Sequence, residues 1–251
     1  MSQHPLESAQ LKIRRAEDHL RAFNECHQRF LDANPYRVTR ELHRDGAEHV
    51  YTVEVRSRPP NYLSAIAGDF FHNLRSALDS VLYDVSVATK PALTAKERRT
   101  IGFPIALREE NLDVAQMRYA PCAAQAEVKA AQPYQGEKAD MHPLWLLRCF
   151  NNIDKHQQVV VVPAHAMGGS WRDSSLPDHP VESFHPVGPF EDGAELARFT
   201  FSRPEPEVDM EFAPMLDVSL GDRVLPASFD MREVLTAVRD DVLPRFAPFV
   251  S

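Results

Sequence analysis

The chain has 251 residues, of which 43% are hydrophobic and 25% are charged. This length and composition allow a substantial buried core, in one large domain or two small ones. The formal net charge is −8. Such an acidic surface repels a phosphate backbone, so the charge disfavours non-specific nucleic-acid binding.

The spacing of the cysteines and the lack of long apolar stretches predict the cellular compartment. The three cysteines are widely spaced and include no C-x-x-C pair, which excludes a zinc site built from thiolates and disfavours a disulfide framework. We therefore expect a cytoplasmic protein. No stretch has the apolar length of a signal peptide or of a membrane span, so we expect no membrane partner.

The first ninety residues predict two long helices that flank a β-hairpin. Apolar residues recur at helical spacing near 8–33 and again near 62–88. Between these helices, apolar and polar residues alternate over 36–42 and 51–55, on either side of Asp45-Gly46. This alternation predicts a hairpin whose connection is longer than two residues.

The remaining chain predicts shorter helices followed by strands. Thr94 and Glu97 have the spacing of a capping box, and Pro121 divides 109–131 into two short helices. A third long helix is predicted over 143–156, and Asp230 caps a last helix. The predicted strands lie near 159–162, 181–187, 194–201 and 208–220.

These elements together predict one α+β domain over residues 1–251. We expect a helical bundle core of three long helices, the N-terminal β-hairpin, and a C-terminal antiparallel β-sheet closed by the last helix. Along the chain, 1–157 is helix-rich, 158–228 is strand-rich and 229–247 is the terminal helix.

Polar side chains that carry chemistry gather on one face of the second long helix. Asp69, His72 and Asp79 lie within one stripe at about 100° per residue, and Arg75 lies beside them. Arg75 and Asp79 are four residues apart and can form an ion pair. Carboxylates near the imidazole would raise its pKa and fix its tautomer.

The helix over 143–156 carries a second cluster of this kind. Arg148, Asn152 and His156 recur every four residues. Lys155 and His156 lie in the last turn, where the helix dipole favours cations. We expect the two clusters to meet in space. The candidate site residues are His72, Arg75, Asp79, Arg148, Asn152, Asp154, Lys155 and His156.

Two segments resemble the signatures of a large family of uncharacterised bacterial proteins. The segment GDFFHNLRSALD (68–79) resembles its first helix motif, and NNIDKH (151–156) resembles its second. FPI (103–105), QPY (132–134) and EDGAELARF (191–199) extend the resemblance over most of the chain. The resemblance implies a bacterial origin and a shared fold, and it names no activity.

A more distant resemblance is to HEPN domains, which are helical bundles that often act as metal-independent ribonucleases. Arg148 and His156 resemble the arginine and histidine of that family. The interval between them is longer here than in the family pattern, and Cys149 stands where a polar residue usually follows the arginine. The resemblance implies RNA as a partner and a homodimer as the active form.

Three interpretations of the clusters stay open. In the first, a histidine moves the 2′-hydroxyl proton of RNA while a cation stabilises the charge on the phosphorane, with no metal or other cofactor. In the second, Asp69, His72, Asp79 and His156 bind a metal ion in the bundle. In the third, the clusters are salt-bridge networks that stabilise a non-enzymatic binding or assembly protein.

Overall fold

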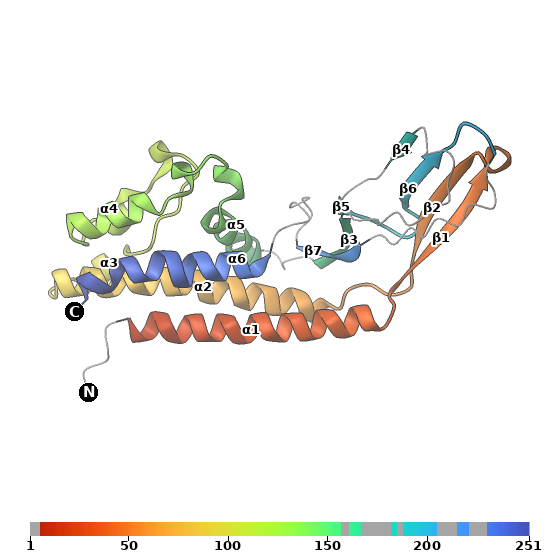
Figure 1. The fold of residues 1–251 in the computed structure, drawn as a ribbon. Helices are drawn as coiled ribbons and strands as arrows, with labels where there is room; N and C mark the ends of the chain where they lie inside the picture. The colour runs from red at the N-terminus through yellow and green to blue at the C-terminus, as the bar shows by residue number, and fades with distance from the viewer. Residues whose placement is uncertain are drawn as a thin grey trace. The chain divides into compact units, whose positions relative to one another are not determined.

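A computed structural model describes residues 6–156, 161–166, 182–184, 188–204, 215–220 and 230–250. Helices and antiparallel strands are both present, which confirms the α+β class (Figure 1). The chain divides into two compact units. The helical unit contains Met1–Phe23, Ala65–Val159 and Asp230–Ser251, and the sheet unit contains Asn24–Ser64 and Val160–Phe229. The expectation of one domain over the whole chain stays a prediction.

The three long helices occur where the sequence predicts them. They are α1 (Glu7–Asp32), α2 (Asn61–Thr89) and α5 (Pro143–His156). Both α1 and α2 run from one unit into the other. The ends of α1 and α2 differ from their predicted positions by one residue, which is within the usual uncertainty of helix ends, and both ends of α5 agree with the prediction.

The apolar stripe of α2 lies in the core of the helical unit. Phe70, Leu74 and Leu78 are fully buried, as their spacing requires. Phe71 stacks on Phe150 of α5 with ring centroids 4.6 Å apart and ring planes 16° apart. This stack brings α2 and α5 together and thereby places their polar residues near one another.

Short elements connect α2 to α5. The predicted capping box is present at α3 (Ala95–Arg98), and α4 (Cys122–Ala130) begins directly after Pro121, as predicted. Before Pro121, however, two 3-10 turns replace the predicted helix. They are η2 (Glu109–Asn111) and η3 (Val114–Met117). The side chain of Asp113 accepts a hydrogen bond from the Ala115 amide, and such local bonds compete with a continuous helix.

Gln132 fixes the segment that precedes η2. This fully buried side chain donates from Nε2 to the carbonyl oxygen of Pro104 over 2.8 Å. Its Oε1 accepts from the amide of Ala106 over 2.9 Å. Two further 3-10 turns, η4 (Pro133–Gln135) and η5 (Ala139–Met141), lead into α5.

The last helix begins at the predicted cap. The Asp230 side chain accepts from the Arg232 amide over 2.8 Å at the start of α6 (Met231–Thr236). The helix continues through a widened π-type turn, Ala237–Val242, into a 3-10 segment, Leu243–Phe249. Phe246 is fully buried, and its ring meets the edge of the Phe103 ring at 6.0 Å.

The sheet unit contains two antiparallel sheets. The four-stranded sheet has the order β1-β2-β6-β4, and the three-stranded sheet has the order β5-β3-β7. Parts of all four predicted strands beyond α5 are present, while 208–214 lies outside the described residues. The strands are β1 (Tyr36–His43), β2 (Glu48–Val55), β3 (Val161–Ala166), β4 (Glu182–Phe184), β5 (Gly188–Pro189), β6 (Glu195–Thr200) and β7 (Met215–Leu220).

The hairpin of β1 and β2 has the longer connection that the sequence predicts. Arg44, Asp45 and Gly46 all have a positive φ, and the largest φ is that of Gly46, at 92°. Glycine tolerates this region best because it has no Cβ. On β6, Arg198 donates to Glu48 over 3.0 Å and thereby links β6 to β2.

Candidate functional site

A polar cavity of about 290 Å³ lies in the helical unit. Three segments that are far apart in the sequence form its walls, namely α2, the stretch from 103 to 116, and α5. Its volume is near the lower limit for small-molecule sites. The lining residues are Arg75, Phe103, Pro104, Ile105, Asn111, Asp113, Gln116, Arg148, Asn151 and Asn152.

Arg75 enters this cavity from α2 and is held by the predicted ion pair. Its Nη2 donates to Oδ1 of Asp79 over 2.8 Å, and the side chain is 17% exposed. The same carboxylate oxygen accepts from the backbone amide of Phe103 over 2.8 Å. Asp79 therefore orients the guanidinium group and fixes the segment that forms the next wall.

Arg148 enters the cavity from α5. Its Nη1 donates to the carbonyl oxygen of Ile105, and its guanidinium group lies over the Trp145 ring at 5.3 Å. Within the part of the chain that the structure describes, no carboxylate pairs with Arg148. Its positive charge is therefore available to a bound anion.

The two arginines are close enough to affect each other electrostatically. Burial lowers the pKa of Arg75, the carboxylate of Asp79 opposes this change, and the positive charge of Arg148 lowers the pKa further. Arg75 nevertheless stays protonated at neutral pH, because arginine loses its proton only under very alkaline conditions. An anion between them would relieve their repulsion.

Asn151 contributes a buried polar group without a partner. The residue is 2% exposed, and its Oδ1 makes no hydrogen bond to any described residue. A buried acceptor left in this state costs about 1–3 kcal/mol. Asn151 follows Arg148 by three residues, so both occupy the same side of α5.

The wall opposite α5 comes from the 3-10 turns. Asp113 accepts from the Ala115 amide over 3.1 Å and from Nε2 of Gln116 over 3.0 Å. Its negative charge is thus partly satisfied by local donors. Asn111 and Gln116 add neutral amide groups to the lining.

The structure brings together some of the predicted site residues. Arg75, Arg148 and Asn152 line one cavity, and Asp79 holds Arg75 in place. His72 is exposed on α2 and is not among the lining residues. The side chains of Asp154, Lys155 and His156, in the last turns of α5, lie outside the described residues. The catalytic role of all eight residues stays a prediction.

Sequence reasoning missed several lining residues. Asn151 could have been found, because it lies one turn after Arg148 on a helix that was predicted correctly. Asn111 and Gln116 gave no such signal, because they occupy irregular turns about thirty residues before α5.

The described residues offer no set of ligands for the metal ion of the second interpretation. They contain no group of three or more His, Cys, Asp or Glu side chains that could hold a metal ion. Asp69, His72 and Asp79 therefore do not form such a group by themselves. The fourth proposed ligand, His156, has a side chain outside the described residues.

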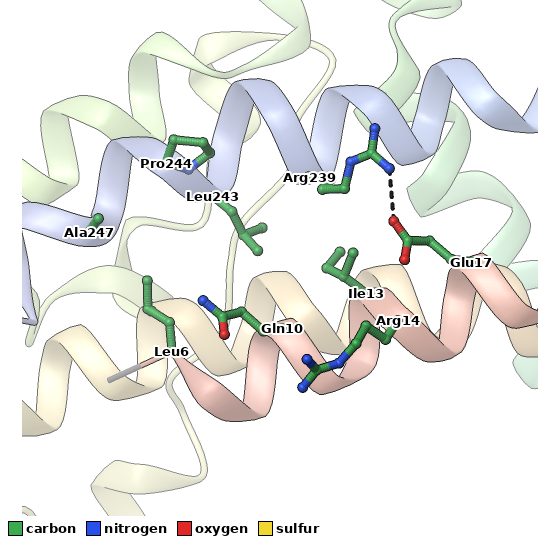
Figure 2. Close-up of a pocket in the computed structure, with 9 residues that line it drawn as sticks. All are labelled: Leu6, Gln10, Ile13, Arg14, Glu17, Arg239, Leu243, Pro244 and Ala247. Atoms are coloured by element: carbon green, nitrogen blue, oxygen red, sulfur yellow. Dashed lines mark hydrogen bonds and ion pairs between the residues drawn. The ribbon is translucent and has the colours of Figure 1, made fainter. Parts of the chain in front are cut away.

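A second cavity, of about 410 Å³, lies between α1 and the end of the chain. Figure 2 shows Leu243 pointing toward α1 and an ion pair between Arg239 and Glu17, with an N–O distance of 2.8 Å. Arg239 also pairs with Asp240 at 2.8 Å. This arginine is thus satisfied by two carboxylates and is not available to an anion in the larger cavity.

Comparisons with models of known protein families, with curated proteins and with solved structures found no match. Across the described residues, the helices lack the combination of length and apolarity that crossing a membrane requires. The geometry of the cavity is therefore the main evidence on function.

Proposed function

We propose that the helical unit binds a phosphate-bearing ligand in the cavity lined by Arg75 and Arg148, hereafter the Arg75–Arg148 pocket. The observation that carries this proposal is that two guanidinium groups from different helices line one cavity, while only one of them, that of Arg75, is paired with a carboxylate, Asp79. The second charge makes the pocket a site for an anion.

Phosphate fits this pocket better than a carboxylate does. A guanidinium group presents its N–H donors as a fork, and one fork can use both oxygens of a carboxylate. A phosphate ester has enough oxygens to accept from Arg75 and Arg148 together. The neutral amides of Asn152 and Gln116 line the same pocket and can donate to the remaining oxygens.

A second candidate function is the metal-independent cleavage of RNA. One observation favours it, namely that Arg148 lines the pocket from the helix that also carries His156, two turns later. In this proposal Arg148 stabilises charge on the phosphorane, and His156 moves the proton of the 2′-hydroxyl. His72, Arg75 and Lys155 are the alternative proton carriers and cations.

Calorimetric titration with inorganic phosphate tests the main proposal. We expect the wild type to bind phosphate and Arg148→Met to bind it about 10- to 100-fold more weakly, because a charge-assisted hydrogen bond is lost. Arg15→Met removes the same charge from an exposed site on α1 and serves as the matched control. Equal binding by wild type and Arg148→Met would contradict the proposal, as would undetectable binding by the wild type at millimolar phosphate.

Electrophoresis of total RNA tests the second candidate. With a chelator present, the wild type should cleave the RNA, and His156→Ala should leave it intact. RNA that survives a large excess of wild-type protein would eliminate this candidate. That result would leave phosphate binding, a non-enzymatic function, in place.

Further proposals concern the packing of the helices, the oligomeric state and the cellular compartment. We propose that the three long helices form one bundle core, that the last helix closes the C-terminal sheet, and that the chain acts as a homodimer in a bacterial cytoplasm. Size-exclusion chromatography with light scattering tests the dimer, because it reports the mass of the particle directly.

A further inference from the structure

Strand β1 lies at one edge of the four-stranded sheet (Figure 1). Among the described strands, β2 alone pairs with it, over the whole length from Tyr36 to His43. On the other side of β1, the backbone N–H and C=O groups of alternate residues therefore have no strand partner within the described part of the sheet. At eight residues, β1 is long enough to bind a further strand through backbone hydrogen bonds.

The exposed charges of β1 have opposite signs four residues apart. Arg37 and Glu41 lie on the same face of the strand, and their side chains are 61% and 67% exposed. Thr39 lies midway between them, and its hydroxyl shares a hydrogen bond of 2.8 Å with that of Thr52 on β2. Charged residues at an edge usually repel an added strand. These charges instead match a second copy of β1 that runs in the opposite direction, because each arginine can then face a carboxylate of that copy.

Symmetry limits the ways in which two copies of β1 can pair. When a two-fold axis relates two antiparallel strands, one residue of each strand faces its own copy. If that residue is Arg40 or Glu41, like charges lie opposite each other, which is unfavourable. If it is Val38, only residues 36–40 of each strand pair. If it is Thr39, residues 36–42 pair and no like charges face each other.

We propose that β1 is the interface of a homodimer, in which two copies of the strand pair antiparallel about a two-fold axis at Thr39. Arg37 of each copy then faces Glu41 of the other, so symmetry forms this ion pair twice. On the opposite face of the strand, Leu42 faces the half-buried ring of Tyr36. Leu42 is 43% exposed in the single chain, so the pairing removes part of an apolar side chain from water.

The contacts that Arg37 and Glu41 make within the chain leave both charges able to pair across the interface. Glu54 lies 3.9 Å from Arg37, and His43 lies 3.5 Å from Glu41. Ion pairs as exposed as these contribute little to stability. Because Glu54 is also the register partner of Arg37 on β2, the guanidinium group lies between two carboxylates in the dimer. The interface rests on the homodimer proposed above, for which it supplies the contact surface, and it is independent of phosphate binding.

Size-exclusion chromatography with light scattering tests the interface through exchanged charges. We expect the full-length wild type to be a dimer. In Arg37→Glu the introduced carboxylate faces Glu41 of the other copy, so the dissociation constant of the dimer should rise about tenfold or more. Glu41→Arg should weaken the dimer equally, because two guanidinium groups then face each other. An equimolar mixture of these two variants should form a heterodimer as tight as the wild-type dimer, since every introduced charge faces its opposite.

The controls separate a failure of this interface from a failure of the homodimer. Arg15→Glu makes the same charge change on α1, where the side chain is exposed, and should leave the dimer intact. A monomeric wild type contradicts both the homodimer and the interface. A dimer that is as tight in both single variants as in the wild type overturns the interface and leaves the homodimer standing. Variants that are folded by circular dichroism and stay monomeric when mixed also overturn the interface.

The wild type provides a second test that requires no variant to fold. Salt screens ion pairs between exposed side chains, so the dissociation constant of the dimer should rise with the NaCl concentration. A dissociation constant that does not change with salt contradicts an interface held by the Arg37–Glu41 pairs. Neither test affects the proposal that the Arg75–Arg148 pocket binds phosphate.

Discussion

Single side chains set the chemistry of the helical unit through what lies next to them. Arg75 and Arg148 are the same residue type, yet one has a carboxylate at 2.8 Å and the other lies over an indole ring and donates to a carbonyl oxygen. This asymmetry leaves the pocket with one guanidinium group that is paired with a carboxylate and one that is not. His142, at the start of α5, shows a similar dependence on its surroundings.

The stability of the protein should depend on pH partly through His142. Burial lowers the pKa of this imidazole, and its Nδ1 accepts from the Leu144 amide over 3.2 Å. The unfolded chain then binds the proton more readily than the folded chain does. The stabilisation is therefore present above the ordinary pKa of about 6.5 and is lost as the pH falls below it.

Thermal unfolding at about pH 7.5 and about pH 5.5 measures this effect. On acidification, the melting temperature of the wild type should fall further than that of His142→Asn. The amide oxygen of the introduced asparagine can still accept from the Leu144 amide. Identical losses in the two proteins would show that another group causes the change.

At the scale of elements, a side chain buried behind the pocket controls the position of a wall. Gln132 pairs with backbone groups of Pro104 and Ala106, on either side of the carbonyl that Arg148 uses. Replacing Gln132 by Leu keeps most of the volume and leaves both backbone groups unpaired. We expect Gln132→Leu to lose about 2–4 kcal/mol of stability and to bind phosphate more weakly.

Urea unfolding and phosphate titration of Gln132→Leu test this expectation together. Gln125→Leu is the matched control, because Gln125 makes one bond, to the Ala120 carbonyl, and is only half-buried. A Gln132→Leu protein with wild-type stability would show that the segment holds its position without these bonds.

The sequence predicts those parts of the fold whose causes are local. Periodic apolar residues gave the three long helices, and the spacing of Thr94 and Glu97 gave a capping box that the structure contains. The Arg75–Asp79 pair also follows from spacing within one helix. Local spacing could not reveal the roles of Gln116 and Gln132, because each depends on a contact with a distant segment.

At the scale of the whole molecule, the net charge of −8 opposes the approach of any polyanion. Binding through one phosphate in one pocket should therefore depend weakly on salt. We expect the affinity for inorganic phosphate to fall about five- to tenfold between about 50 and about 500 mM NaCl, as for a single neutralised phosphate. Calorimetry at both salt concentrations measures the slope. A loss of about a thousandfold would contradict binding through one phosphate in one pocket.

The interleaved order of the two units has a consequence for synthesis. The core of the helical unit includes Val234, Val238 and Phe246, all fully buried and all contributed by the last stretch of the chain. A growing polypeptide leaves the ribosome from its N-terminus, so the Phe103 ring gains its partner only after Phe246 has been made. The surfaces of α4 and α5 that pack against this last stretch must therefore stay exposed to the cell, or to a chaperone, until it has been made.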